Sequence, residues 1–264
     1  MKEQILSQMT TECPWRDTLY WYDTIDSTNT RAKELARNGA PAGTVLVAGN
    51  QTGGRGRLGR KFSSPAGMGV YFSVILRPNC KADALMHLTC AAAVAACNAI
   101  EKTCGISPGI KWINDLVCGK EKLGGILTEM SVNTNGFVDW AVIGIGINCR
   151  QKKNDFPAEL QDMATSLLLQ TGKDCAPALL AAHLTQALYA VNSMLFDKQK
   201  IMDIYRKHCI TLGQKIFVVR GEESAYGEAL DLDRDGGLLV RFSDGTEKIV
   251  SSGEVSIRGM YGYV

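Results

Sequence analysis

The sequence predicts an α+β protein in which a mixed β-sheet with helices is followed by a small all-β domain. Over residues 18–208, apolar runs typical of strands alternate with amphipathic helical segments. From Gly213 onward, short alternating runs are broken by Asp-Gly turn signals at 235–237 and 244–245. The 264 residues, 45% of them hydrophobic, suffice for one large and one small domain. We therefore expect a first domain over 1–211 and a second over 212–264.

The elements of the first domain follow from local patterns. Residues 18–25 are expected to form a strand. A helix should follow from Thr28 to Asn38, since Asp26 or Ser27 suits its N-cap and Gly39 its C′ position. The remaining runs predict a strand at 44–52, a glycine- and arginine-rich loop at 53–69, a strand at 70–78, an alanine-rich helix at 82–104, two strands within 109–130 joined at Gly119, a strand at 137–149, a loop with a short helix at 155–172, and mostly helix at 176–208.

Charge and hydropathy exclude several classes of protein. The chain carries 29 basic and 27 acidic residues, a net charge of +2, whereas a general polyanion binder has a clear basic excess. We therefore expect no nucleic-acid partner. The first 17 residues lack the apolar core of a secretory signal, and no apolar run approaches the ~20 residues that cross a membrane. We expect a cytoplasmic protein without a membrane partner.

The nine cysteines indicate a reducing compartment. Their number is odd, and no pair has the CxxC spacing. Cys90, Cys97 and Cys104 recur every seven residues in the expected helix, so they should share one buried face as small apolar residues. None of the three histidines pairs with a cysteine at zinc spacing. We expect no metal site built by the protein itself.

The loop at 53–60 formally contains GxGxxG, in the order Gly54-Arg55-Gly56-Arg57-Leu58-Gly59. A dinucleotide site needs a helix directly after the third glycine, and RKFSSPAGMG does not begin one well. A Walker A loop fails too, because Gly59 is followed by Arg60 rather than by the required lysine. The glycines still allow close approach of a ligand, and Arg55, Arg57, Arg60 and Lys61 can gather an anion. A solvated basic loop and a single-stranded RNA-binding loop remain alternatives.

Two further clusters lie at strand ends. Lys111, Trp112, Asn114 and Asp115 crowd together, and Lys122 opens the otherwise apolar run LGGIL. The glycines at 124–125 and in 144–148 let a flat ligand lie on a strand, although a bulge or a packing need explains such pairs equally well. Asn148 can pair with an amide or an adenine edge.

Taken together, these segments resemble the biotin–protein ligases over roughly residues 18–258, in the family's order and spacing. The specific part is the combination of GRGRLGR with KWIND. The resemblance is carried by Asp26-Ser27-Thr28-Asn29, Gln51, GRGRLGR at 54–60, KWIND at 111–115, Lys122-Leu123-Gly124-Gly125-Ile126-Leu127, GIGIN at 144–148 and GEVSIR at 253–258.

The chain departs from the family pattern at two apolar positions. Ile113 replaces the proline of KWPND, and Phe62 replaces the usual tryptophan. Both changes bear on ligand packing rather than on the chemistry. Only 26 residues precede Ser27, fewer than the winged helix-turn-helix of the repressor-type members requires, so we expect the single-function class.

The resemblance implies a class II synthetase-like catalytic domain of the biotin–lipoate ligase type, binding biotin and ATP over 1–211, and an SH3-like β-barrel over 212–264. It implies a ligase that converts biotin and ATP, with Mg²⁺, to biotinyl-5′-AMP. Biotin would then pass to a lysine of a carboxylase's biotin carboxyl-carrier domain. A monomer and a homodimer both remain open.

The resemblance also implies the site residues. Biotin would contact Ser27, Thr28, Asn29, Gln51, Arg55, Gly56, Arg57, Lys122, Gly125 and Gly144. ATP would contact Arg57, Arg60, Lys122, Asn148 and Arg258. The catalytic set would be Arg57, Lys122, Asp115 and Lys111, in which the cations neutralise a carboxylate and a polyphosphate. Asp115 would either orient an arginine or accept the proton of the acceptor lysine.

Two other functions remain as alternatives to a biotin–protein ligase. A lipoate ligase or octanoyltransferase is related in fold and also moves an acyl chain, but GRGRLGR and KWIND favour biotin. A non-enzymatic RNA-binding module could use the Arg/Gly loop. The small net charge and the lack of an RNP-type aromatic motif disfavour it.

Overall fold

The larger sheet of the computed structural model is mixed, as expected from the sequence. The structure describes residues 1–251 and 256–259, and within them seven strands pair in the order β1-β2-β3-β7-β6-β5-β4. β1 and β2 are parallel, and every other neighbouring pair in this order is antiparallel. The strands are β1 Leu19–Tyr22, β2 Val45–Ala48, β3 Gly69–Leu76, β4 Gly109–Lys111, β5 Asp115–Cys118, β6 Glu121–Val132 and β7 Val138–Asn148.

Residues 109–130, expected to form two strands, form β4, β5 and the first part of β6. Lys111 pairs with Asp115 across a turn at 112–114, and β5 reaches β6 through a second turn at Gly119. The expectation of two strands was wrong because the first turn, at 112–114, contains no glycine or proline to mark it. This turn brings Lys111 and Asp115 to the same end of their hairpin.

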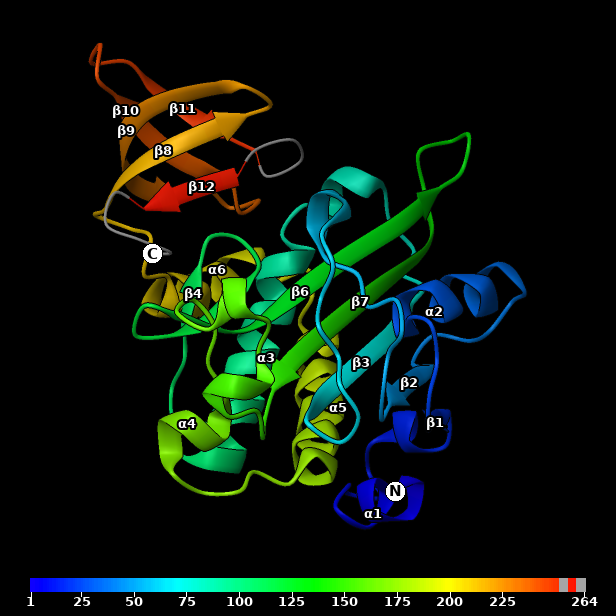
Figure 1. Ribbon diagram of the computed structural model, residues 1–264. Coiled ribbons are helices and arrows are strands. Elements are labelled where there is room, and N and C mark those ends of the chain that lie inside the picture. Colours follow the sequence, from blue (N-terminus) through cyan, green and yellow to red (C-terminus); the bar gives the residue numbers. More distant parts are fainter. Residues whose placement is uncertain (252–255, 260–264) are drawn as a thin grey trace.

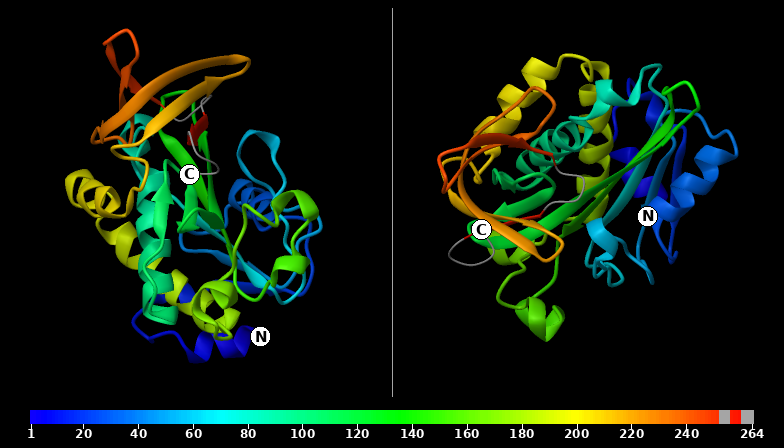
Figure 2. Two further views of the ribbon diagram at one scale, coloured as in Figure 1. Left: turned by 60° about the vertical axis from the view of Figure 1, so that its left-hand side comes forward. Right: turned by 90° about the horizontal axis from the view of Figure 1, so that it is seen from above.

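Helices cover both faces of this sheet (Figures 1 and 2). They are α1 Lys2–Ser7, α2 Thr28–Arg37, α3 Leu88–Cys104, α4 Leu167–Thr171, α5 Pro177–Ser193 and α6 Lys198–His208, with 3₁₀ turns at Pro14–Arg16, Arg57–Gly59, Ala82–Leu85, Lys153–Asp155 and Ala158–Leu160. Ser27, one of the two expected N-caps of α2, accepts from Thr30 N at 3.4 Å. Gly39 follows the helix with φ +84°, as expected of a C′ glycine.

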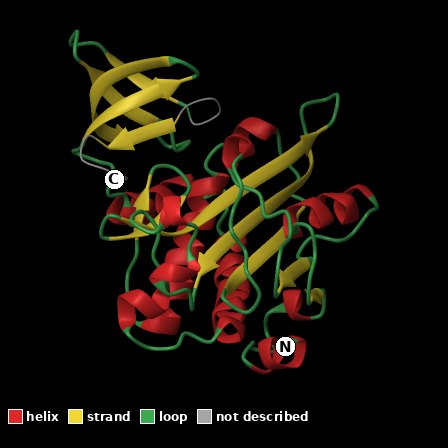
Figure 3. Ribbon diagram, viewed as in Figure 1, coloured by secondary structure: helices red, strands yellow, loops and turns green. Residues whose placement is uncertain are grey.

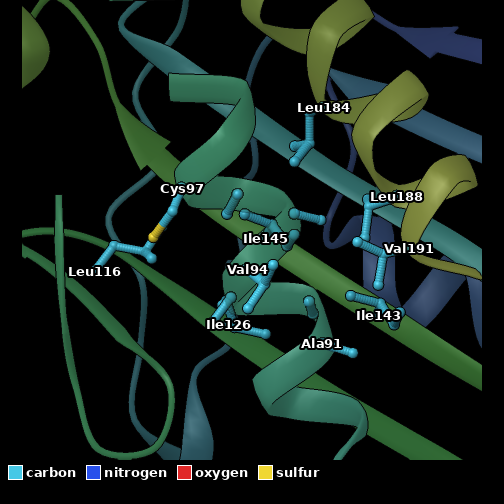
Figure 4. Close-up of a cluster of buried hydrophobic side chains, with 14 of the residues drawn as sticks. Ala91, Val94, Cys97, Leu116, Ile126, Ile143, Ile145, Leu184, Leu188 and Val191 are labelled. Atoms are coloured by element: carbon cyan, nitrogen blue, oxygen red, sulfur yellow. The ribbon is translucent and has the colours of Figure 1, made fainter. Parts of the chain in front are cut away.

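α3 lies in the core between the sheet and α5 (Figure 4). Its apolar residues bury on nearly all sides, including Val94 against Ile126 and Ile145 of the sheet. The segment Ala82–Cys104 spans 23 residues with mean hydropathy 1.4, longer than the apolar runs expected from the sequence. Length and composition alone would let it cross a membrane, but 72% of its most apolar window is buried inside the protein, as in a core helix.

Most cysteines pack as small apolar side chains. Cys90 and Cys97 are fully buried on α3, as their spacing predicted, whereas Cys104 at the helix end is only half-buried. Burial raises the pKa of the Cys97 thiol to about 12, which keeps it protonated. The described cysteines are all free thiols.

The described C-terminal residues form an antiparallel sheet of five strands in the order β11-β10-β9-β8-β12 (Figure 3). They are β8 Lys215–Arg220, β9 Glu223–Leu232, β10 Leu238–Phe242, β11 Glu247–Val250 and β12 Ser256–Gly259. The β9–β10 turn packs on the β4–β5 turn, where Trp112 Nε1 donates to Gly236 O at 2.8 Å. Gly236 has φ +85°, and a Cβ there would lie 2.8 Å from Cys90 Sγ of α3. A glycine thus allows the β9–β10 turn to approach α3 and KWIND closely.

Candidate active site

A cavity of about 850 Å³ gathers the residues expected to bind ligands. Such a volume suits a small organic ligand together with a nucleotide. Its lining includes the expected residues Ser27, Thr28, Asn29, Gln51, Arg55, Gly56, Arg57, Arg60, Lys111, Asp115, Lys122, Gly125, Gly144 and Asn148. The exception is Arg258. Arg258 lies in β12 and its backbone pairs with Phe217 of β8, but its side chain falls outside the described part of the chain.

One wall is built where α2 begins. Gln51 Oε1 accepts from Thr28 N at 2.8 Å and from Thr28 Oγ1 at 3.1 Å, while Gln51 Nε2 donates to Ser64 Oγ at 2.9 Å. Ser73 of β3 donates to Asn29 Oδ1 at 2.6 Å. These hydrogen bonds, most of them partly buried, preorganise a polar wall able to hydrogen-bond a polar ring of a small ligand.

Glu129 of β6 supports this wall, and the sequence analysis did not identify it. Its carboxylate accepts from Asn29 Nδ2 at 3.1 Å and from Lys33 Nζ at 2.6 Å. Arg55 NH1 of the Arg/Gly loop lies 3.8 Å from the same carboxylate. Burial raises the pKa of Glu129, but hydrogen bonds from Lys33 and Asn29 outweigh it and hold the pKa below its ordinary value. Glu129 therefore stays ionised and links α2, β6 and the loop.

The expected catalytic residues meet on the other side of the cavity. Lys122 Nζ lies 2.5 Å from Asp115 Oδ1, and Arg57 NH1 donates to Asn114 Oδ1 at 2.9 Å. Burial is the main cause that lowers the pKa of the Arg57 guanidinium, opposed by the nearby Asp115 carboxylate. Lys111, 8% exposed, pairs with Asp115 in the β4–β5 hairpin. Two cations on rigid strands thus stand beside one on the loop, an arrangement that suits an anionic reacting centre.

A third wall comes from residues 156–164, which were expected only as loop and short helix. Lys122 N donates to Met163 O at 2.7 Å, and Thr165 N donates to Lys122 O at 2.8 Å. This pairing brings Phe156, Leu160, Met163 and Ala164 into the lining, next to Asn148. No motif marks these residues in the sequence, because their role depends on a tertiary strand-to-loop contact. An apolar slot beside an amide fits a purine base.

Position 144 has no room for a side chain, because Asn29 occupies the space beside it. A Cβ at Gly144 would overlap the Asn29 side-chain amide. Asn29 has little room to yield, since Ser73, Glu129 and the Leu127 carbonyl all hold it. Gly146 similarly leaves room for Phe62, whose ring would lie 2.5 Å from an added Cβ. These close approaches, rather than a bulge, explain the glycine pair of β7.

Replacing Gly144 with alanine should raise the KM for biotin, the ligand that the sequence resemblance implies, about 10- to 100-fold, because overpacking a rigid site costs roughly 1–3 kcal/mol. Steady-state adenylation over a biotin series measures it. Gly53→Ala is the matched control, since a Cβ there would meet the main-chain carbonyl of Asp26 at an ordinary contact distance, 3.4 Å from its oxygen. Equal KM values for Gly144→Ala and the unmodified protein would contradict the rigidity assigned to Asn29.

Comparison with known proteins decides the family. Residues 21–148 match the Biotin/lipoate A/B protein ligase family, and residues 211–258 match the Biotin protein ligase C terminal domain. The Bifunctional ligase/repressor BirA of Bacillus subtilis is 38% identical over 237 residues, covering 89% of this chain and 72% of the relative. This chain is a biotin protein ligase family member.

Other members of the biotin protein ligase family agree. The Biotin--[acetyl-CoA-carboxylase] ligase of Paracoccus denitrificans is 30% identical over 89% of this chain and 98% of its own length. The biotin protein ligase from Aquifex aeolicus, solved in complex with biotin and ATP, superposes with a TM-score of 0.78 at 32% identity, covering 91% of this chain and 98% of that one. The expected class II synthetase-like fold, the SH3-like C-terminal domain and the assignment as a ligase are thereby confirmed.

Proposed function

We propose that this biotin protein ligase joins biotin to AMP in the cavity and then transfers biotin to a lysine of a carboxyl-carrier domain. In the first step a biotin carboxylate oxygen attacks the α-phosphorus of ATP, and pyrophosphate leaves. In the second step the deprotonated amine of the acceptor lysine attacks the acyl carbonyl. AMP leaves, and an amide bond remains. The family match and the arrangement of cations around the cavity support the proposal.

Mg²⁺ enters this scheme with ATP as part of the substrate. Among the described residues no group of three or more His, Cys, Asp or Glu side chains could hold a metal ion. Of the carboxylates in or near the cavity, Asp115 and Glu129 are each ion-paired with a lysine. Magnesium commonly stays bound to substrate phosphates and waters. The chain's role is to complement the complex with Arg57, Arg60, Lys111 and Lys122.

The binding residues divide between the two ligands. Ser27, Thr28, Asn29 and Gln51 form the polar wall that would hold the ureido ring. The other residues expected to contact biotin would line the path from that wall toward the reacting carboxylate. They are Arg55, Gly56, Arg57, Lys122, Gly125 and Gly144. Asn148 and the apolar segment 156–164 would enclose adenine, with Arg258 as a phosphate contact. Asp115 orients Lys122, since its carboxylate lies 2.5 Å from Nζ.

The single observation that carries the proposal is one cavity containing both the polar wall and the Lys122–Asp115–Arg57 cluster. It is tested by biotin-dependent exchange of labelled pyrophosphate into ATP, with lipoate and octanoate as control acids. We expect exchange with biotin but not with lipoate or octanoate. After a carrier domain is added, we expect AMP as the product. Formation of ADP would rule out the adenylate. Exchange driven by lipoate would favour the lipoate-ligase alternative.

The acceptor and the compartment also belong to the proposal. A carrier domain whose acceptor lysine is replaced by arginine should remain unlabelled, and mass spectrometry of the intact domain detects this. We place the reaction in the cytoplasm, in keeping with the free thiols of the described cysteines.

A further inference from the structure

Gln151 is a buried side chain that touches the cavity only through another residue. It follows β7 by three positions and is 1% exposed, and it does not line the cavity. Its main-chain carbonyl accepts from Ser166 Oγ at 2.6 Å. Its side-chain Nε2 donates to Asn148 Oδ1 at 3.2 Å. The side chain of Gln151 thus hydrogen-bonds to Asn148, whose amide is proposed to face the nucleobase.

The amide of Asn148 is held in one of its two orientations. Its Nδ2 donates to the main-chain carbonyl of Thr165 at 3.0 Å, and a carbonyl can only accept, so the NH₂ group must lie on that side. Gln151 occupies the oxygen side with a donor. An asparagine amide has two N–H donors and two acceptor lone pairs. One donor and one acceptor therefore remain, in a fixed order.

A fixed donor–acceptor order discriminates between purines. On its N1 edge, adenine presents the N6 amino donor beside the N1 acceptor, and an asparagine amide, which carries both an acceptor and a donor, can pair with such an edge through two hydrogen bonds. Hypoxanthine has the same shape, but at the corresponding positions it presents the O6 acceptor and the N1–H donor. An amide that is free to turn by 180° can form both hydrogen bonds with either base. An amide held in one orientation can form both of them only with adenine.

We propose that Gln151 is a positioning residue that holds the Asn148 amide in its adenine-reading orientation and so makes the enzyme selective for ATP. The inference rests on the proposed function, because it takes Asn148 to face the base. Thr165 contributes through its main chain, so the side chain of Gln151 is the part that substitution can remove. Within residues 1–251 and 256–259, Gln151 Oε1 has no hydrogen-bond partner, so the bond from Nε2 to Asn148 is the contact of this side-chain amide that the structure describes.

The test compares kcat/KM for ATP and ITP in biotin-dependent pyrophosphate exchange. In the unmodified enzyme we expect ATP to be preferred by about 10- to 100-fold, the discrimination typical of a well-placed pair of hydrogen bonds. Gln151→Met keeps the length and removes the donor. It should lower the ATP/ITP ratio about 10-fold, through a higher KM for ATP and a lower KM for ITP, with the KM for biotin unchanged. A side chain that served only packing would weaken both nucleotides equally.

Gln170→Met is the matched control. Gln170 is exposed and donates to Thr165 Oγ1 at 2.9 Å, so it contacts the same segment without reaching Asn148. It should leave the ATP/ITP ratio unchanged, and an equal change in both variants overturns the proposal. Efficient use of ITP by the unmodified enzyme overturns it as well, even if Gln151→Met does not fold. Asn148→Ala distinguishes failure of the proposed function from failure of the role of Gln151. If Asn148→Ala leaves the ATP/ITP ratio unchanged, the proposed placement of adenine beside Asn148 is wrong. If Asn148→Ala changes the ratio and Gln151→Met does not, only the positioning role of Gln151 is wrong.

Discussion

Replacing Lys122 with alanine should slow formation of the adenylate by about 10²- to 10³-fold, the usual loss when one preorganised electrostatic contact to a transition state is removed. Lys122 lies at the start of β6, and its Nζ is held 2.5 Å from Asp115 Oδ1. Met163 and Thr165 hydrogen-bond to its main-chain N–H and C=O, respectively. The charge is therefore in place before the ligands bind, and it should stabilise the transition state more than bound biotin.

Single-turnover adenylation at saturating ATP measures this effect, and equilibrium binding of biotin measures ground-state affinity. Lys122→Met separates charge from volume, since it keeps the length of the side chain. It should be as slow as Lys122→Ala. Lys122→Arg retains the charge with a different shape and should lose less. An adenylation rate for Lys122→Met close to that of the unmodified enzyme would remove Lys122 from the catalytic group.

Replacing Arg57 with alanine should release the adenylate about 10- to 100-fold faster, because a hydrogen bond to a charged group contributes about 1.5–3 kcal/mol. Arg57 belongs to the Arg/Gly loop but donates to Asn114 Oδ1 at 2.9 Å, so its side chain links the loop to the β4–β5 turn. Arg55 makes a longer contact with Glu129 at 3.8 Å. Without Arg57 the loop should open more often, and a reactive acyl adenylate should reach solvent and label lysines indiscriminately.

Release of labelled biotinyl-AMP in a filter or rapid-dilution assay measures this, together with labelling of a bystander protein. Arg31→Ala is the control, because Arg31 forms a surface pair with Glu34 on α2, remote from the loop's contact with Asn114. Such a pair contributes little. Retention of the adenylate by Arg57→Ala for as long as by the unmodified enzyme would show that Arg57 does not close the loop.

Periodicity determined much of the fold. The capped helix beginning after Ser27, the long strand ending at Asn148 and the switch to short strands after Gly213 were all visible in the sequence, because each has a local signature of capping, alternation or turn residues. The β4–β5 hairpin was not, since its turn at 112–114 contains no glycine or proline. Only the pairing of Lys111 with Asp115 in the folded sheet reveals it.

Residue chemistry determined most members of the candidate site. Glycine–arginine loops and lysines at strand ends are unusual enough, in this order, to be found by resemblance. The cavity gathers every expected side chain that the structure describes. Their individual roles remain predictions for the experiments above.

Tertiary structure alone decided how the site residues are supported. Glu129 is an ordinary acidic residue in a strand, yet its contacts with Asn29, Lys33 and Arg55 link β6 to α2 and to the Arg/Gly loop. Gln151 is an ordinary polar residue after a strand, yet it holds Asn148. Local sequence encodes which groups can bind a ligand, because that depends on chemical type. Which groups hold them in place depends on contacts between segments up to 100 residues apart, as between Asn29 and Glu129, and these arise only when the chain folds.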